Sequence, residues 1–218
     1  MHTIGRLLRL LFGLFLYAVG IVLTMKAHIG YAPWEVFHAG LANVLGLQIG
    51  NVTIWVGVAI GLIVMLSGER IGLGTVSNMV LVGLFMNMLL KSTLIKEQSS
   101  FLPGILQLVV GLFVISLASF FYISSGFGAG PRDSLMVFLS RKSGLSVGVC
   151  RGAIELSVTI VGFLMGGMLG WGTLLSAFLI GFCIQLTFRV LRFDPKTVVH
   201  DDFVSSWHKF GRLMGKQV

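Results

Sequence analysis

Long apolar stretches, separated by short polar segments, follow one another along most of the chain. Each is close to the roughly 20 residues that an α-helix needs to cross a hydrocarbon core, and none alternates with the period of two typical of a transmembrane β-strand. The pattern therefore predicts an all-α membrane protein with six transmembrane helices, near residues 7–25, 48–66, 74–91, 103–123, 147–165 and 173–191.

Composition points to the same class of protein. Hydrophobic residues make up 56% of the 218 residues and charged residues only 11%, whereas a soluble domain carries about 25% charged residues. The net charge of +8 comes from basic residues that mostly flank the apolar stretches. Orientation in a membrane explains this charge better than nucleic-acid binding does. We expect the plasma membrane as the location and no nucleic-acid partner.

The second half of the chain repeats the first. A shift of 98 residues aligns residues 7–90 with 105–188 without a gap, and eight glycines coincide, where chance would give about two. Each half contains a span, a turn, a short helix, a second span, a glycine-rich turn and a third span. Because each half has an odd number of spans, it ends on the opposite side of the membrane from its start, and the two halves would enter the membrane from opposite sides. This predicts two inverted three-helix repeats, a construction found in many secondary transporters.

These boundaries divide the chain into a first repeat at 1–98, a second repeat at 99–193 and a tail at 194–218. In the tail, apolar residues recur at helical spacing among basic ones, as in a basic amphipathic helix that lies on an anionic leaflet. A frayed soluble tail is the alternative. The apolar residues are Phe203, Trp207, Phe210 and Met214.

Lysine and arginine are distributed unevenly between the two sides. With the N-terminus inside, thirteen of the sixteen basic residues lie on the cytoplasmic side, and only Lys26, Lys91 and Lys96 lie outside. The positive-inside rule then predicts that both termini are cytoplasmic. It also predicts that Arg132 lies inside and its counterpart Trp34 outside.

Two short segments have corresponding places in the two halves: GYAPWEVF at 30–37 and GAGPRDSL at 128–135. In each, a proline is followed two residues later by an acid, Glu35 or Asp133, and thirteen residues later by a glycine. Proline at the first position, an acid in the first turn and glycine at the end all favour a short helix. One interpretation is structural, with the acids stabilising the helix N-termini. The other is that both helices line a cavity with Glu35 and Asp133 at its two mouths.

The turns before the third spans carry the pattern GxxxGxGT in both halves. Their glycines predict tight turns and close helix approach, with Thr75 and Thr173 as N-caps. Because no strand precedes the pattern and no lysine follows it as in a phosphate-binding loop, we expect no nucleotide site. The residues assigned to turns and caps in the two halves are Gly30, Pro33, Gly72, Gly74, Thr75, Gly128, Pro131, Gly170, Gly172 and Thr173.

Three of these motifs resemble a known family. They are Gly-x-x-Pro-Trp-Glu at 30–35, Gly-Glu-Arg-x-Gly-Leu-Gly-Thr at 68–75 and Gly-x-Gly-Pro-Arg-Asp at 128–133. They are similar to those of the YczE-like family of bacterial integral membrane proteins, and the resemblance extends over residues 7–190. The family's usual acid after Pro-Trp is Asp, where this chain has Glu35, which leaves a capping role intact. The resemblance implies an integral membrane protein and transfers neither an activity nor a binding residue.

The fifth span contains two charges, Arg151 and Glu155, four residues apart on one helix face. Charges inside a span are costly and often functional. Alternatively, Arg151 extends toward the membrane surface and Glu155 pairs with it. Asn87 and Gln185, in spans three and six, occupy corresponding positions. They are either part of a solute path or partners in hydrogen bonds between helices.

We interpret the chain as a small-solute transporter or channel with a site between the repeats. The alternative is a membrane scaffold or accessory subunit that holds a cytoplasmic partner through the tail. A homodimer in the lipid bilayer is a further expectation. No catalytic, metal-ligand or cofactor pattern is present in the sequence, so we do not expect an enzyme. The candidate path or gating residues are Glu35, Asp133, Arg132, Arg151, Glu155, Asn87 and Gln185.

Overall fold

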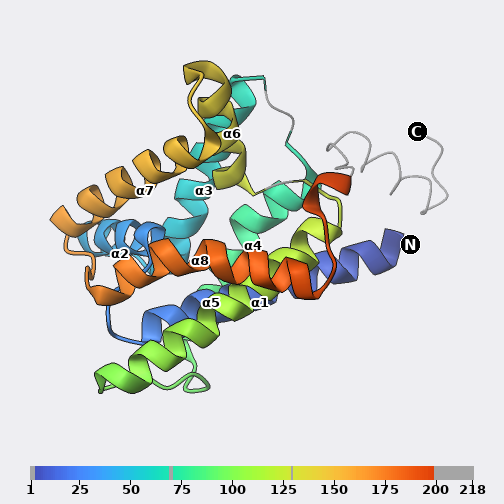
Figure 1. Cartoon of the computed structure of the whole chain (residues 1–218). Helices are drawn as coiled ribbons and strands as arrows, with labels where there is room; N and C mark the ends of the chain where they lie inside the picture. The colour runs from blue at the N-terminus through green and yellow to red at the C-terminus, as the bar shows by residue number, and fades with distance from the viewer. Residues whose placement is uncertain (1–2, 69–70, 129, 199–218) are drawn as a thin grey trace.

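The computed structural model describes residues 3–68, 71–128 and 130–198, so that most of the predicted tail helix lies outside the described residues. The described residues form eight α-helices and end in a 3-10 turn, Pro195–Thr197 (Figure 1). The α-helices are α1 (Thr3–Lys26), α2 (Pro33–Leu45), α3 (Ile49–Leu66), α4 (Leu73–Lys91), α5 (Phe101–Ser124), α6 (Pro131–Ser143), α7 (Val147–Leu164) and α8 (Trp171–Val190).

Six of the described helices are long and apolar enough to cross a membrane. They are α1, α3, α4, α5, α7 and α8, and each coincides with one of the six spans predicted from the sequence. The prediction of six apolar membrane-length helices is therefore confirmed.

The two short helices also form as predicted. Helices α2 and α6 have 13 residues each and begin at Pro33 and Pro131. Both end at a glycine in the left-handed region, Gly46 at φ 65° and Gly144 at φ 72°. Proline suits a first turn, whose amides have no partner within the helix, and glycine adopts positive φ without a steric penalty.

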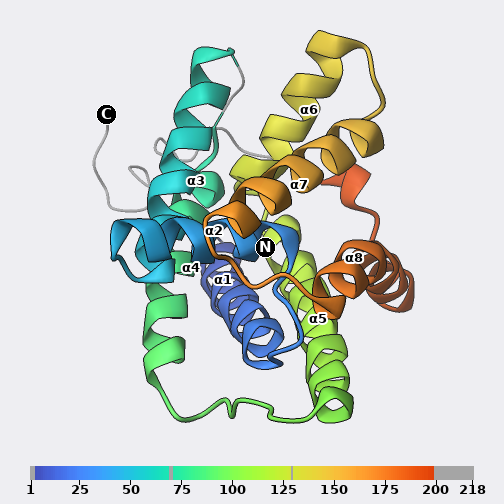
Figure 2. The same ribbon diagram turned by 90° about the vertical axis from the view of Figure 1, so that its left-hand side faces the viewer.

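The helices form two groups. In the core group, α1 packs against α4 and α5, and α5 also packs against α8. In the short-helix group, α2 and α6 each pack against both α3 and α7. Figures 1 and 2 show α3, α6 and α7 in the upper part of the molecule and α1 and α5 in the lower part. Each group contains helices from both halves of the chain.

Each group has its own apolar cluster. The larger cluster joins buried residues of α1, α4, α5 and α8, including Leu14, Met86 and Leu112. The smaller one joins Trp34, Ile60 and Val64 with partly buried residues of α6 and α7. Close van der Waals packing among these side chains holds each group together, because lipid tails are as apolar as the side chains and provide no hydrophobic driving force. The boundary between the two clusters is where the polar residues gather.

Helices α1 and α5 approach closely at the centre of the core group. A β-carbon at Gly13 would lie 2.8 Å from the Tyr122 amide nitrogen, and one at Gly20 would lie 2.6 Å from Ile115 Cγ1. Small residues allow helix backbones to approach in this way, and close packing drives helix association in membranes.

Two loops cross from one half of the chain to the other. The amide of Gly172 donates to the Ile29 carbonyl at 2.7 Å, and the amide of Gly74 donates to the Phe127 carbonyl at 2.7 Å. The donors are 98 residues apart, and so are the acceptors. The end of α1 is thereby bonded to the start of α8, and the end of α5 to the start of α4.

The threonines of the glycine-rich turns have a different place from the predicted one. Gly72 and Gly170 are the N-caps of α4 and α8, so the prediction that Thr75 and Thr173 are N-caps is wrong. The threonines lie three residues into the turn and accept from the cap amides, at 3.4 Å for Gly72 and 3.2 Å for Gly170. They still satisfy an amide that the helix leaves unpaired.

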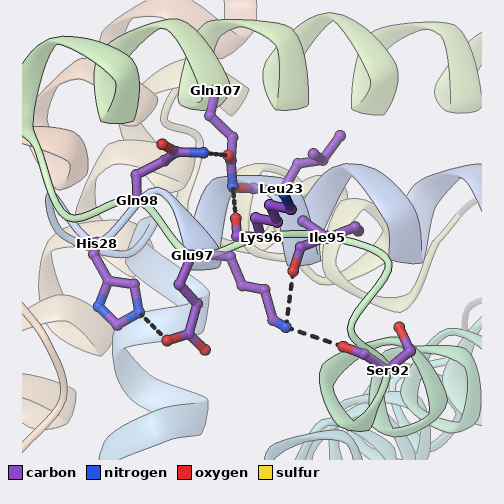
Figure 3. A network of polar contacts seen from close by, with 9 residues as sticks. Leu23, His28, Ser92, Ile95, Lys96, Glu97, Gln98 and Gln107 are labelled. Carbon is purple, nitrogen blue, oxygen red and sulfur yellow. Dashed lines mark hydrogen bonds and ion pairs between the residues drawn. The ribbon is translucent and has the colours of Figure 1, made fainter.

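The segment between α4 and α5 is bound to the end of α1 (Figure 3). Lys26 Nζ donates to the Ile95 carbonyl at 3.0 Å. Gln107 Nε2 donates to the carbonyls of Leu23 and Lys96, both at 3.2 Å, while Gln107 Oε1 accepts from Gln98 at 2.6 Å. These bonds hold the two halves together at this end of the α1–α5 pair.

Candidate functional site

Two neighbouring cavities lie between the core group and the short-helix group. They measure about 120 Å³ and about 80 Å³. Residues of α4 line the first and residues of α8 line the second, and both reach the first turns of α2 and α6. The residues that line both cavities are Tyr17, Ile21, Trp34, Arg132, Arg151 and Glu155.

The N-termini of the two short helices meet between these cavities. Arg132 Nη1 of α6 lies 3.5 Å from Glu35 Oε1 of α2. The same guanidinium lies over the Trp34 ring, with Cζ 4.6 Å from its centroid, which is a cation–π contact. Each short helix starts just after a loop that reaches into the opposite half, so the two starts converge at the centre of the molecule.

This convergence corrects two predictions. Glu35 and Asp133 do not lie at opposite mouths of a cavity, because Glu35 is paired with Arg132, the neighbour of Asp133. Arg132 and Trp34 do not lie on opposite sides of the membrane, because they are in contact. Rules for loop charge place residues at the membrane surfaces, and they fail for a loop that folds back into the protein.

The charged pair in the fifth span forms as one interpretation predicted. Arg151 Nε donates to Glu155 Oε1 at 2.8 Å, one helical turn along α7. Both residues nevertheless line both cavities. The pair therefore faces the protein interior, where an intramembrane charge costs less than it would in lipid.

The two acids of the short helices have different surroundings. Glu35 is buried, and burial raises the pKa of its carboxyl against the opposing effect of Arg132. Asp133 is exposed at the wall of the larger cavity. Protein still surrounds its carboxyl closely enough to raise its pKa, a shift that the guanidiniums of Arg151 and Arg132 oppose.

Unpaired polar atoms gather around the cavities. Within the part of the chain that the structure describes, four buried side-chain polar atoms have no hydrogen-bond partner, and all four belong to residues that line a cavity. Buried polar atoms are nearly always paired, and an unpaired one costs about 1–3 kcal/mol. A polar solute or water in the cavities would pair with them. The atoms are Trp34 Nε1, His38 Nε2, Tyr122 Oη and Ser176 Oγ.

His38 is neutral in this setting. Burial holds the pKa of its imidazole well below the ordinary value, and Arg132 acts in the same direction. Its Nδ1 lies 3.3 Å from Thr53 Oγ1, which leaves Nε2 as the unpaired ring nitrogen. His38 therefore contributes hydrogen bonding and no charge.

The last two candidate path residues, Asn87 and Gln185, lie away from the cavities. Asn87 Oδ1 accepts from the Gly50 amide at 3.0 Å, and its Nδ2 donates to Asn51 Oδ1 at 2.7 Å. Asn87 thus bonds α4 to α3. Gln185 is exposed on α8 and lines neither cavity.

Sequence reasoning overlooked several cavity residues, chiefly Tyr17, Tyr122, His38 and Trp34. Aromatic residues in apolar spans are ordinarily interpreted as core or interface residues, so their type is a weak signal. Trp34 and Arg132 are counterparts in the 98-residue alignment, but the alignment does not indicate which counterparts touch each other.

Known relatives extend over most of the chain. An uncharacterized membrane protein of Bacillus subtilis, YczE, is 33% identical over 177 residues, which cover 80% of this chain and 81% of that protein. An uncharacterized protein of Haemophilus influenzae is 31% identical over 182 residues, covering 84% of this chain and 83% of its own length. The uncharacterized protein YyaS of Bacillus subtilis is 23% identical over 179 residues, which cover 80% and 88%.

No solved structure matches the chain. A family model, described as a family of unknown function, DUF6198, matches residues 4–189, which include all six membrane-length helices almost entirely. Together with the uncharacterized membrane protein YczE, this match confirms the resemblance found in the sequence motifs. The chain is a multi-pass membrane protein and belongs to the DUF6198 family.

Proposed function

We propose that this protein is a small-solute transporter that works by alternating access, with its site in the cavities between the two helix groups. The proposal includes a location in the plasma membrane with both termini cytoplasmic, and a construction from two inverted repeats. The reciprocal bonds Gly172 to Ile29 and Gly74 to Phe127 support the repeats, because a two-fold axis exchanges one bond with the other. The pairing of α1 with α4 and of α5 with α8 supports them in the same way.

The observation that carries the proposal is a difference between the halves. Helices α3 and α4 are in tight contact, since a β-carbon at Gly83 would meet the Gly50 carbonyl oxygen and lie 2.6 Å from Ile54 Cγ1. At the corresponding positions of α7 and α8, β-carbons at Gly148 and Gly181 would meet no atom within 4 Å. The glycines are present in both halves, but only the first pair is packed.

A transporter of this construction needs two arrangements of similar stability. In the one described, α3 is closed on α4, while α7 and α8 are apart beside the cavities. In the second arrangement, α7 closes on α8 through Gly148 and Gly181, and α3 separates from α4. Because the short-helix group packs as a unit, it can turn against the core group and open the cavities first to one side and then to the other.

Paired cysteines test this movement directly. Asn51 and Asn87 are bonded across α3 and α4, and their counterparts Val149 and Gln185 are exposed on α7 and α8. In a background with Cys150 and Cys183 replaced by alanine, we expect the double variant N51C/N87C to form a disulfide readily. We expect V149C/Q185C to form one as well, more slowly, because it requires the second arrangement. The measurement is the rate of cross-linking in native membranes under mild oxidation.

The same variants control a flux assay. In proteoliposomes tested with a panel of labelled small solutes, either disulfide should abolish the uptake that the reduced protein supports, because each one holds the short-helix group in one arrangement. If V149C/Q185C never cross-links while N51C/N87C always does, α7 does not close on α8. Alternating access would then be excluded for this protein.

A further inference from the structure

The charges around the cavities do not balance. Besides the neutral His38, five ionisable side chains of the short-helix group gather there, and four of them form two pairs. Arg132 is paired with Glu35 and Arg151 with Glu155. The Asp133 carboxylate has no hydrogen bond or ion pair with any residue that the structure describes, although it lines the larger cavity. With all five ionised, the cavity walls carry one uncompensated negative charge.

The position of Asp133 in the first turn of α6 stabilises this charge only in part. A helix N-terminus contributes about half a positive charge, and the contribution is modest where water has access. Glu35 has the same place in α2, and it still has a guanidinium beside it. Asp133, on its matching helix, has no such partner among the described residues.

The surroundings of Asp133 fit a ligand that donates hydrogen bonds. Tyr122 is 4% exposed, its hydroxyl is unpaired, and it lines the same cavity as Asp133. A β-carbon at Gly130 would lie 3.4 Å from Asp133 Oδ2 and 3.8 Å from the Tyr122 hydroxyl, so both oxygens border one small space. The aromatic rings of Tyr17 and Trp34 also line this cavity, and aromatic faces attract cations.

An anion fits this site less well. The guanidinium of Arg132 is held by Glu35 and by the Trp34 ring, and that of Arg151 by Glu155. An anion would be attracted by these two guanidiniums, but the three carboxylates of the site would repel it. A cation would balance the charge of the unpaired Asp133 carboxylate.

We propose that the larger cavity binds a compact organic cation, with its ammonium group between the Asp133 carboxylate and the Tyr122 hydroxyl oxygen. The proposal rests on the proposed transport function and names its class of solute. The volume of about 120 Å³ suits a solute no larger than several water molecules. The ammonium donates to Asp133 and to Tyr122. Protons compete for the same carboxylate, and the other charged or titratable groups around the cavity are Arg132, Arg151, Glu155, Tyr17 and His38.

Equilibrium binding tests the proposal without any flux. The probes are n-propylammonium and methylammonium chloride, with propionate and n-propanol as the matched anion and neutral molecule, at constant ionic strength. Thermal unfolding of the purified full-length protein in nanodiscs reports binding as a rise in melting temperature. We expect the two ammonium probes to raise it and the other two to leave it unchanged. The apparent affinity for the ammonium probes should fall as the pH is lowered.

Variants locate the site. Asp133→Asn should weaken ammonium binding by about thirtyfold or more, because it removes one partner of a charge pair. Tyr122→Phe should weaken it severalfold while leaving the charge in place. Glu97→Gln removes an acid that is 63% exposed beside His28 and is the control that should bind normally.

Several outcomes would overturn the proposal. In the ligand panel, they are stabilisation by propionate instead of the ammonium probes, or stabilisation by none of the four molecules. In the variants, the contradicting outcome is full ammonium affinity in Asp133→Asn. Should that variant fail to fold, full affinity in Tyr122→Phe contradicts the proposal in its place. None of them would affect the cysteine cross-linking of α7 to α8. A failure of the ligand class is therefore distinguishable from a failure of alternating access.

Discussion

Gly83 on α4 and Gly181 on α8 are counterparts, and their surroundings differ. A β-carbon at Gly83 would meet the backbone of Gly50 on α3, whereas one at Gly181 would have open space around it. Asn87 and Gln185, one turn further along the same helices, differ likewise, since Asn87 bonds to α3 and Gln185 is exposed. Matching sequences thus adopt unlike packing in the two halves. In the described arrangement, the glycine pattern is packed between α3 and α4 and is not packed between α7 and α8.

The largest expected effect comes from breaking the packed interface. Gly83→Val should destabilise the protein by about 1–3 kcal/mol, because the added side chain cannot fit against the α3 backbone. Gly181→Val makes the same change in the same kind of helix without a clash, and it should change stability little. The comparison is made by thermal unfolding of both variants in detergent. Equal losses in the two variants would show that α7 and α8 are packed in the same way as α3 and α4.

A smaller effect is expected from the hydrogen bonds beside these glycines. Asn87→Ala removes bonds to the Gly50 amide and to Asn51, and it should cost about 1 kcal/mol, since hydrogen bonds between membrane helices average roughly 0.6 kcal/mol each. Gln185→Ala should be close to neutral in the same measurement. A larger loss for Gln185→Ala than for Asn87→Ala would contradict the arrangement described.

The smallest effect concerns pH and the acids of the two short helices. Burial raises the pKa of Glu35 above its ordinary value of 4.5, so the folded protein binds this proton more tightly than the unfolded chain does. The contribution of Glu35 to the free energy of unfolding is complete below pH 4.5, and it is lost as the pH rises through the raised pKa. Glu35→Gln should therefore make the fall of melting temperature with rising pH shallower. Glu97→Gln is the control, and an unchanged slope in Glu35→Gln would mean that Glu35 does not contribute to it.

The site was partly predictable. Glu35, Arg132, Asp133, Arg151 and Glu155 were all candidates, because charges are rare in a chain of this composition and are costly near apolar spans. Their arrangement was not predictable from local rules. Loop charges were assigned to the membrane surface nearest in sequence, whereas the starts of α2 and α6 fold back and meet at the centre.

The aromatic and hydroxyl residues of the site carry no comparable signal. Tyr17, Tyr122 and Ser176 stand in apolar helices, where most such residues pack or bond to their own backbone. What distinguishes Tyr122 and Ser176 is that their hydroxyls have no partner among the described residues. This is a property of the neighbours that surround them, and these neighbours come from other helices.

The sequence by itself determined the elements that depend on short-range physics. Apolar length set the six membrane-length helices, and proline, an acid and glycine at fixed spacing set the two short ones. Tertiary structure alone decided which matching interface is packed, where the short helices point and which acid has no partner among the described residues. The meeting of the short helices depends on contacts between segments nearly a hundred residues apart, such as Glu35 with Arg132. The packing of each interface depends on which neighbours the same glycine pattern meets in each half, and a local pattern does not contain that information.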